Sequence, residues 1–340
     1  MVNFRDYTVV ENGRKLIEPC FCIALFTSAL VTKNMAPEGL LTPYRVFLDD
    51  FLPEVNWILT DGNQMRGEKI TSQRLDVLEN WLHKPRRTVF MGAPPVEIYK
   101  GKDADEVSTP TLSWYYDTYF AVPVDPVEET TMSIKEMKTI PQRGFGRYRI
   151  KLSLDWLAKE GMSGVENLLA RMLKDFPLSF GYAGYSLAYN DRGLTPSLEQ
   201  FIRQWLLRYP GLLCPESYTE ANASAVQDAI SGIGWMTILN EEFCQRLGGY
   251  DAFAQKLKGF STLTDLPQNN ILIRIGDEPA LGDIKAGDLL KIYQSVGSVL
   301  RPIFLRNMDQ EHMEGRIGMD GLKDNTERVK WLSRFFDCAV

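Results

Sequence analysis

Histidine is nearly absent from the sequence, which has only His83 and His312 among its 340 residues. A Ser-His-Asp or Cys-His catalytic device would have to use one of these two residues. His83 stands at the predicted end of a helix, and His312 lies in the polar segment DQEHMEG, where a surface position is the simpler interpretation. The sequence therefore predicts no catalytic residues of these classes.

Phosphate-binding loops and zinc-binding spacings are also lacking. The segment GFGRYR at residues 144–149 has two glycines but leads into a predicted strand, and no glycine-rich stretch ends in Gly-Lys-Ser or Gly-Lys-Thr. The five cysteines are odd in number and have no C-x-x-C spacing, which indicates reduced thiols rather than a disulfide framework or a zinc site. We expect neither a cofactor nor a metal ion.

Long apolar runs and an excess of basic charge are missing too. The most apolar early stretch, residues 20–31, is too short to span a bilayer, and the first residues carry no export signal. The 38 Lys and Arg residues against 44 Asp and Glu residues give a net charge of -6. A protein that neutralises DNA phosphates over a wide surface would be basic. We therefore expect a cytoplasmic protein that binds neither membrane nor nucleic acid directly.

Alternating and helical hydrophobic patterns are present along the whole chain. Residues 147–154 alternate polar and apolar side chains, which predicts a strand with one wet face that carries Arg147, Arg149 and Lys151. Ser163 and Glu166 form a capping box ahead of an apolar stripe, so a helix is expected to begin at Ser163. Further strands are predicted near 20–31, 56–60, 87–91, 112–121, 178–189, 233–239 and 271–275, and helices near 43–55, 72–84, 195–209 and on either side of Gly248 and Gly249.

These elements predict an α+β fold with mixed or antiparallel sheets and packed helices. Strands and helices alternate in each half of the chain, which allows two related halves, although no residue motif is shared between them. A segment rich in proline and charge, residues 122–144, separates the halves. We expect an N-terminal half at 1–125, a linker at 126–146 and a C-terminal half at 147–337.

Carboxylates gather after the last predicted strand, in the stretch ILIRIGDEPALGD at residues 271–283. Asp277 and Asp283, followed by Lys285, resemble the acids and lysine with which metal-dependent nucleases hold magnesium and activate water. Proline and glycine in this stretch instead indicate one continuous loop, in which Asp277 and Asp283 would cap backbone N–H groups. The structural interpretation is favoured, and the catalytic one remains an alternative.

Two other acidic runs and one aromatic run have two interpretations each. The acidic residues are either solvated loops or a negative surface offered to a basic partner. The aromatic residues fill a core or anchor an interface. The acidic residues are Asp103, Asp105, Glu106, Asp125, Glu128 and Glu129, and the aromatic ones are Trp114, Tyr115, Tyr116, Tyr119 and Phe120.

Six short motifs occur in order along the chain: GYAG at 181–184, PGLL at 210–213, GIGWMTILN at 232–240, LGG at 247–249, IRIGDEPALGD at 273–283 and WLSRFFD at 331–337. Together they resemble the TsiV-like immunity family of bacterial type VI secretion systems, over roughly residues 20–337. The residues expected to form the structural motifs are Gly181, Tyr182, Gly184, Pro210, Gly211, Trp235, Gly276, Pro279, Gly282, Asp283 and Trp331.

The resemblance implies a cytosolic immunity protein rather than an enzyme. Such a protein would bind a cognate effector toxin, a basic VRR-Nuc DNase, in a 1:1 complex and cover its DNA-binding or active site. Two other classes of function stay open. One is a metal-dependent hydrolase that uses Asp277, Asp283 and Lys285, and the other is a structural component of a secretion or phage-like assembly.

Overall fold

The computed structural model describes residues 4–31, 38–60, 67–83, 95–103, 106–120, 142–190, 195–213, 228–304, 331 and 334–335. Its strands are β1 (Val9–Glu11), β2 (Arg14–Val31), β3 (Trp57–Leu59), β4 (Glu68–Lys69), β5 (Val96–Lys100), β6 (Ser108–Phe120), β7 (Gln142–Ser153), β8 (Leu178–Tyr189), β9 (Met236–Leu239), β10 (Thr262–Leu266) and β11 (Asn270–Arg274). Its α-helices are α1 (Thr42–Phe51), α2 (Ser72–Leu75), α3 (Val77–His83), α6 (Leu154–Met172), α7 (Pro196–Arg208), α9 (Glu241–Arg246), α10 (Tyr250–Leu257) and α11 (Lys291–Leu300).

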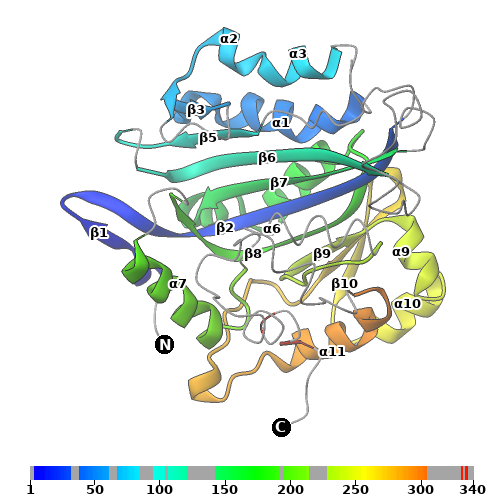
Figure 1. Ribbon diagram of the computed structural model, residues 1–340. Helices are drawn as coiled ribbons and strands as arrows, with labels where there is room; N and C mark the ends of the chain where they lie inside the picture. The colour runs from blue at the N-terminus through cyan, green and yellow to red at the C-terminus, as the bar shows by residue number, and fades with distance from the viewer. Residues whose placement is uncertain are drawn as a thin grey trace, which may run out of the picture.

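All the described strands belong to one antiparallel sheet, which confirms the predicted α+β class (Figure 1). The strand order is β10-β11-β9-β8-β2-β7-β6-β5-β3-β4, and β1 forms a hairpin with β2. The 18-residue strand β2 lies at the centre, where Ile23 faces Ile150 of β7 on one side and Ala183 of β8 on the other. The predicted strand at 20–31 is thus confirmed and extends further toward the N-terminus.

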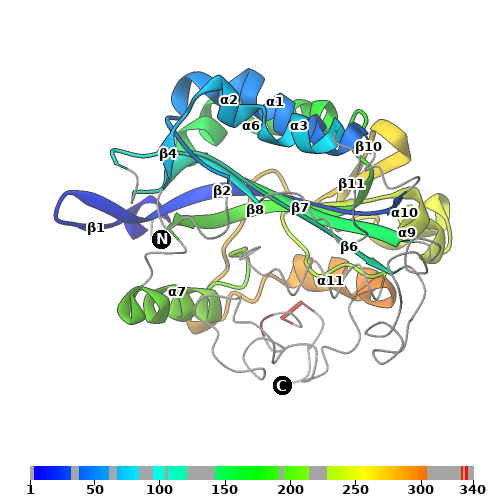
Figure 2. The same cartoon turned by 45° about the horizontal axis from the view of Figure 1, so that its top comes forward.

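Helices cover both faces of the sheet. Figure 2 shows α1, α3 and α6 on one face and α7 and α11 on the other. The main core joins the sheet to helices on both faces, and a second, smaller core packs Ile202, Trp205 and Leu206 of α7 against the ends of β2 and β8. Apolar side chains at helical spacing on α7 therefore face the sheet, as their pattern predicts.

The burial of β7 differs from the prediction. Arg147, Arg149 and Lys151 were expected on a wet face, but they are only 8%, 5% and 2% exposed. Alternation reports which side chains share a face of a strand, and it cannot tell whether that face meets water or another layer of the protein. Here the polar face of β7 is buried as well as the apolar one.

The start of α6 also differs from the prediction. The helix begins at Leu154, and Ser153 is its N-cap, because the Ser153 hydroxyl accepts a hydrogen bond from the Trp156 N–H at 3.0 Å. Ser163 lies inside the helix, two residues after a break at Gly161, whose φ is +64°. The break separates two helical segments, so the helix predicted to begin near Ser163 corresponds to the second segment, and the first segment, which begins at Leu154, was not predicted.

Several sequence predictions remain untested. The predicted strand at 87–91 and most of the predicted linker at 126–146 lie outside the described residues, so the division into two halves stays a prediction. Cys20, Cys22 and Cys244 are buried free thiols, whereas Cys214 and Cys338 lie outside the described residues. In the part of the chain that the structure describes, none of the helices combines the length and apolar character that crossing a membrane requires.

Candidate functional site

The carboxylate-rich segment forms a compact loop between β11 and α11. The backbones of Asp283 and Asp288 exchange two hydrogen bonds of 2.9 and 3.0 Å, which close a tight turn. Gly276, Gly282 and Gly287 adopt φ values of +73°, +65° and +77°, a left-handed region that glycine enters without steric cost. This agrees with the expectation of one continuous, glycine-shaped loop.

Asp283 is held by an arginine from another element. Arg208, the last residue of α7, donates from Nε and Nη2 to the two carboxylate oxygens at 3.0 and 2.6 Å. Asp283 also accepts from the Lys285 backbone N–H at 3.0 Å, so its expected capping role is confirmed. The hydrogen bond from Arg208 is the main cause of a lowered pKa for Asp283.

Asp277 lies apart from this pair. Its side chain is 97% exposed and contacts Arg274 at 3.1 Å, rather than capping the loop as expected. Among the described residues, no group of three or more His, Cys, Asp or Glu side chains is placed to hold a metal ion. Asp283 and Asp277 therefore contact two different arginines, Arg208 and Arg274. This arrangement favours the structural interpretation of the loop over a magnesium site.

Contacts connect five of the six sequence motifs, one of which includes part of this loop. The Gly211 N–H donates to the Leu281 carbonyl at 2.8 Å, and a Cβ on Gly211 would overlap the carbonyl oxygen of Ala280. Gly211 therefore allows a close approach that a larger residue would block. The other contacts are Trp235 Nε1 to the Gly276 carbonyl (3.3 Å), Arg334 Nε to the Pro210 carbonyl (2.6 Å), Gly184 beside Leu213, Gly232 beside Tyr182, and Arg334 over the Trp331 ring.

The acidic residues predicted to contact a partner differ in how far they are exposed. Asp103 is partly exposed and forms an ion pair of 2.7 Å with Arg14 on the β1–β2 hairpin. Glu106 is only 8% exposed, which leaves little of its side chain for a partner. Asp105, Asp125, Glu128 and Glu129 lie outside the described residues. A role of these acids in partner binding stays a prediction.

The aromatic run contributes to the core. Trp114 and Tyr116 of β6 are 2% and 1% exposed and stack on each other, which confirms the core interpretation for these two. Tyr115 points to the opposite face and is half-buried. The side chains of Tyr119 and Phe120 are not among those described.

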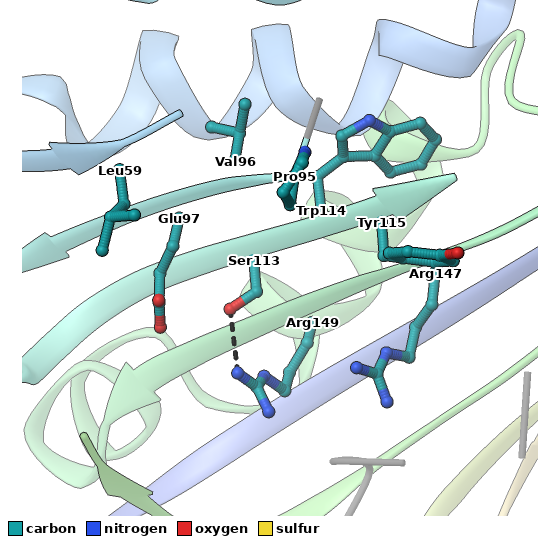
Figure 3. A pocket seen from close by; sticks show the side chains of 9 residues that line it. All are labelled: Leu59, Pro95, Val96, Glu97, Ser113, Trp114, Tyr115, Arg147 and Arg149. Carbon is teal, nitrogen blue, oxygen red and sulfur yellow. Dashed lines mark hydrogen bonds between the residues drawn. The ribbon is translucent and has the colours of Figure 1, made fainter. Parts of the chain in front are cut away.

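A pocket of about 120 Å³ opens on the Tyr115 side of the sheet (Figure 3). Glu97 of β5, Ser113 of β6 and Arg149 of β7 lie in one row across the three strands, and Arg149 Nη2 donates to Ser113 Oγ at 3.0 Å. Arg147 extends beside Tyr115 in the same lining. Two guanidinium groups suit a carboxylate or phosphate. Because the alternating pattern of β7 predicts that these arginines face water, the sequence does not indicate this pocket.

Apolar side chains are exposed on the loop between β11 and α11 and on the first turn of α11. Seven large hydrophobic residues are exposed among the described residues, and three of them, Ile284, Leu289 and Ile292, fall within nine consecutive positions. The sequence indicates this exposure only at residues 289–293, where four of five side chains are apolar. A single face of a helix cannot bury all four.

Comparison with known proteins gives one family and one fold. A family model described as "TsiV: Type VI immunity for VRR-NUC" matches residues 131–335, more than half of the chain. No curated protein sequence matches. A solved structure of the Pseudomonas aeruginosa type VI secretion system protein PA0821 has a TM-score of 0.65 and 16% sequence identity, and the match covers 95% of this chain and 83% of that one. At this identity the likeness shows the fold alone.

Proposed function

The chain belongs to the TsiV family of type VI immunity proteins, and from this premise we propose that it neutralises a cognate VRR-NUC effector by covering the effector's DNA-binding surface or active site. The family match carries the proposal, because it spans more than half of the chain and names the class of effector. The effector would be a DNase, the complex would hold one copy of each protein, and this chain would act in the cytoplasm of the toxin-producing cell and its kin.

Charge supports this mode of inhibition. A nuclease holds its substrate through phosphates, so the surface that receives DNA is basic. This chain carries a net charge of -6. Opposite charge accelerates encounter and orients the partners, and an acidic protein can occupy a basic cleft where DNA would otherwise lie.

The carboxylate loop supports binding rather than metal chemistry. Asp283 is bound to Arg208, and Asp277 contacts Arg274. A two-carboxylate metal site would require both groups to turn toward one ion, which would break both arginine contacts. These contacts instead fix the conformation of the loop at the protein surface.

The first experiment is co-expression with the product of the neighbouring gene. We expect growth rescue and a complex that co-elutes, with a mass by light scattering that fits one copy of each protein. A well-folded chain that neither rescues growth nor binds the effector would overturn the proposal. Magnesium-dependent nuclease activity of the chain alone, lost in Asp283→Ala, would replace it with the hydrolase alternative.

The mode of inhibition needs a second measurement. An inactivated effector is bound to labelled duplex DNA, and the chain is titrated into the complex. Displacement of DNA at stoichiometric amounts is the expected result. A ternary complex, in which DNA stays bound while cleavage by active effector is blocked, would overturn the covering of the DNA-binding surface.

A further inference from the structure

The pocket beside Tyr115 brings two buried arginines into one wall (Figure 3). Arg149 faces Ser113 of β6 in the strand register, and Arg147 faces Tyr115 two positions away. Arg149 and Arg147 are only 5% and 8% exposed. Moving a charged group out of water costs free energy unless an opposite charge or a hydrogen-bonding partner compensates it. Two neighbouring guanidinium groups in a buried wall therefore favour an anion in the pocket.

The charges in the lining of this pocket do not cancel. Among the described residues that line it, Glu97 of β5 is the one acid, and it lies in the same strand row as Ser113 and Arg149. Two guanidinium groups and one carboxylate give the lining a net charge of +1. Lys151, the next residue on this face of β7, is a further buried cation and lies over the Tyr189 ring at 4.8 Å. The pocket is therefore electropositive in a chain whose overall charge is -6.

The size and the net charge of the pocket select the class of ligand. Its volume of about 120 Å³ is well below the roughly 300–1,000 Å³ of sites that enclose drug-sized molecules, so the ligand is small. A phosphate carries roughly 1.5 to 2 negative charges at neutral pH, whereas a carboxylate carries one. A lining of +1 balances a carboxylate and leaves part of the charge of a phosphate uncompensated. Leu59 and Pro95 add an apolar side to the lining, against which a short hydrocarbon group fits.

We propose that this pocket binds a small monocarboxylic acid in its ionised form. The carboxylate of the ligand accepts hydrogen bonds from Arg147 and Arg149, and its short hydrocarbon part lies against Leu59. The Ser113 hydroxyl accepts from Arg149 Nη2 at 3.0 Å and thereby orients this guanidinium. Guanidinium groups bind a carboxylate through paired hydrogen bonds, so that geometry adds to charge. The inference goes beyond the proposed neutralisation of an effector and does not depend on it, because it concerns a ligand of this chain alone.

The test titrates propionate and benzoate into the full chain at neutral pH and constant ionic strength, and calorimetry measures binding. At least one of the two acids is expected to bind the wild type, and inorganic phosphate is expected to bind on the order of tenfold more weakly. Arg147→Met should raise the dissociation constant of the acid by about ten- to a hundredfold, because a charged hydrogen-bond donor is lost. The matched control is Arg301→Met, which removes an exposed arginine outside the pocket and should leave binding unchanged.

A second variant tests the charge of the lining, and it decides the question if Arg147→Met does not fold. Glu97→Gln raises the net charge to +2, so the acid should bind on the order of tenfold more tightly and phosphate should bind as well. Glu242→Gln, which changes an exposed acid on α9, is its control. If neither acid binds the folded wild type, or if phosphate binds it as tightly as the acids do, the inference is wrong. If the free acids do not bind and Arg147→Met weakens binding of the effector, the pocket receives an acidic side chain of the partner, and a small ligand is excluded.

Discussion

Arg208 and Asp283, 75 positions apart in the chain, hold each other through two hydrogen bonds between a guanidinium and a carboxylate. The pair connects the C-terminal end of α7 to the turn that precedes α11. This bidentate geometry fixes the relative orientation of the guanidinium and the carboxylate as well as the distance between them. The pair thus adds a link between the loop and α7, whose apolar side chains form part of the smaller core.

Asp283→Asn should lower the urea midpoint of unfolding at neutral pH. The folded-state pKa of Asp283 is lowered by Arg208, so the stabilisation is present above the unfolded-state pKa of roughly 3.9 and disappears as pH falls through the folded-state value. The difference in midpoint between wild type and variant, measured from pH 7 to pH 3, should therefore shrink with acid. A difference that does not depend on pH would mean that charge plays no part in this contact.

Glu18→Gln should destabilise the start of β2 and β6 by about 2 kcal/mol, because charged hydrogen bonds to a shielded carboxylate are lost. Glu18 accepts from Lys15, from the Ser108 hydroxyl at 2.7 Å and from the Thr109 N–H at 3.0 Å. Burial raises the pKa of Glu18, but these contacts outweigh burial and lower it overall.

The pH dependence follows from that sign. The contribution of Glu18 is present above the unfolded-state pKa of roughly 4.3 and is lost as pH falls through the lower folded-state pKa. Urea unfolding of the wild type and of Glu18→Gln at several pH values measures it. Glu11→Gln, an exposed carboxyl on the same hairpin, is the control and should leave the midpoint unchanged within error.

Gly211→Ala should cost about 3 kcal/mol of stability, at the upper end of what overpacking costs, because the added methyl group meets the backbone of Ala280. The control is Gly287→Ala, where a Cβ meets no atom within 4 Å but the φ of +77° is unfavourable for alanine. That variant should lose about 1 kcal/mol. Equal losses in chemical denaturation would show that backbone conformation, and not the close approach, explains the glycine.

The rate of association with the effector should depend on salt concentration through the acidic residues of the loop between β11 and α11. Neutralising Asp277, Glu278 and Asp288 to their amides is expected to slow association on the order of tenfold at low salt and to change dissociation little. Stopped-flow mixing at several salt concentrations measures both rates. Glu242→Gln with Asp251→Asn, exposed acids on α9 and α10, serves as the control. If that control slows association equally, the steering comes from the charge of the whole molecule.

Local pattern was sufficient to predict most elements of this fold. Residues 20–31 form part of β2, residues 178–189 form β8, and the stripe that follows Thr195 forms α7, each because side-chain period follows backbone geometry. The order of the strands depends on contacts distant in sequence, and no local pattern contains it.

The wrong predictions and the missed surface have a common physical origin. Alternation on β7 could not reveal that Arg149 and Lys151 are buried. The capping box at Ser163 stands at the start of the helical segment after Gly161, and it does not indicate that an earlier segment begins at Leu154. Leu289 and Leu290 are identical side chains in adjacent positions, and only the left-handed backbone at Leu290 decides which of them is exposed. Each outcome depends on tertiary structure.

The position of β2 determines when this protein can fold during its synthesis. Ile17 at the start of the strand pairs with Tyr189, about 170 residues later, and its other neighbour β7 begins only at Gln142. At bacterial rates of translation this separation corresponds to on the order of ten to thirty seconds. Throughout that interval the apolar segment FCIALF leaves the ribosome without the strands that pair with it in the native sheet. The soluble yield of this chain should therefore depend on the supply of chaperones that shield unpaired strands. Growth at a lower temperature should raise that yield.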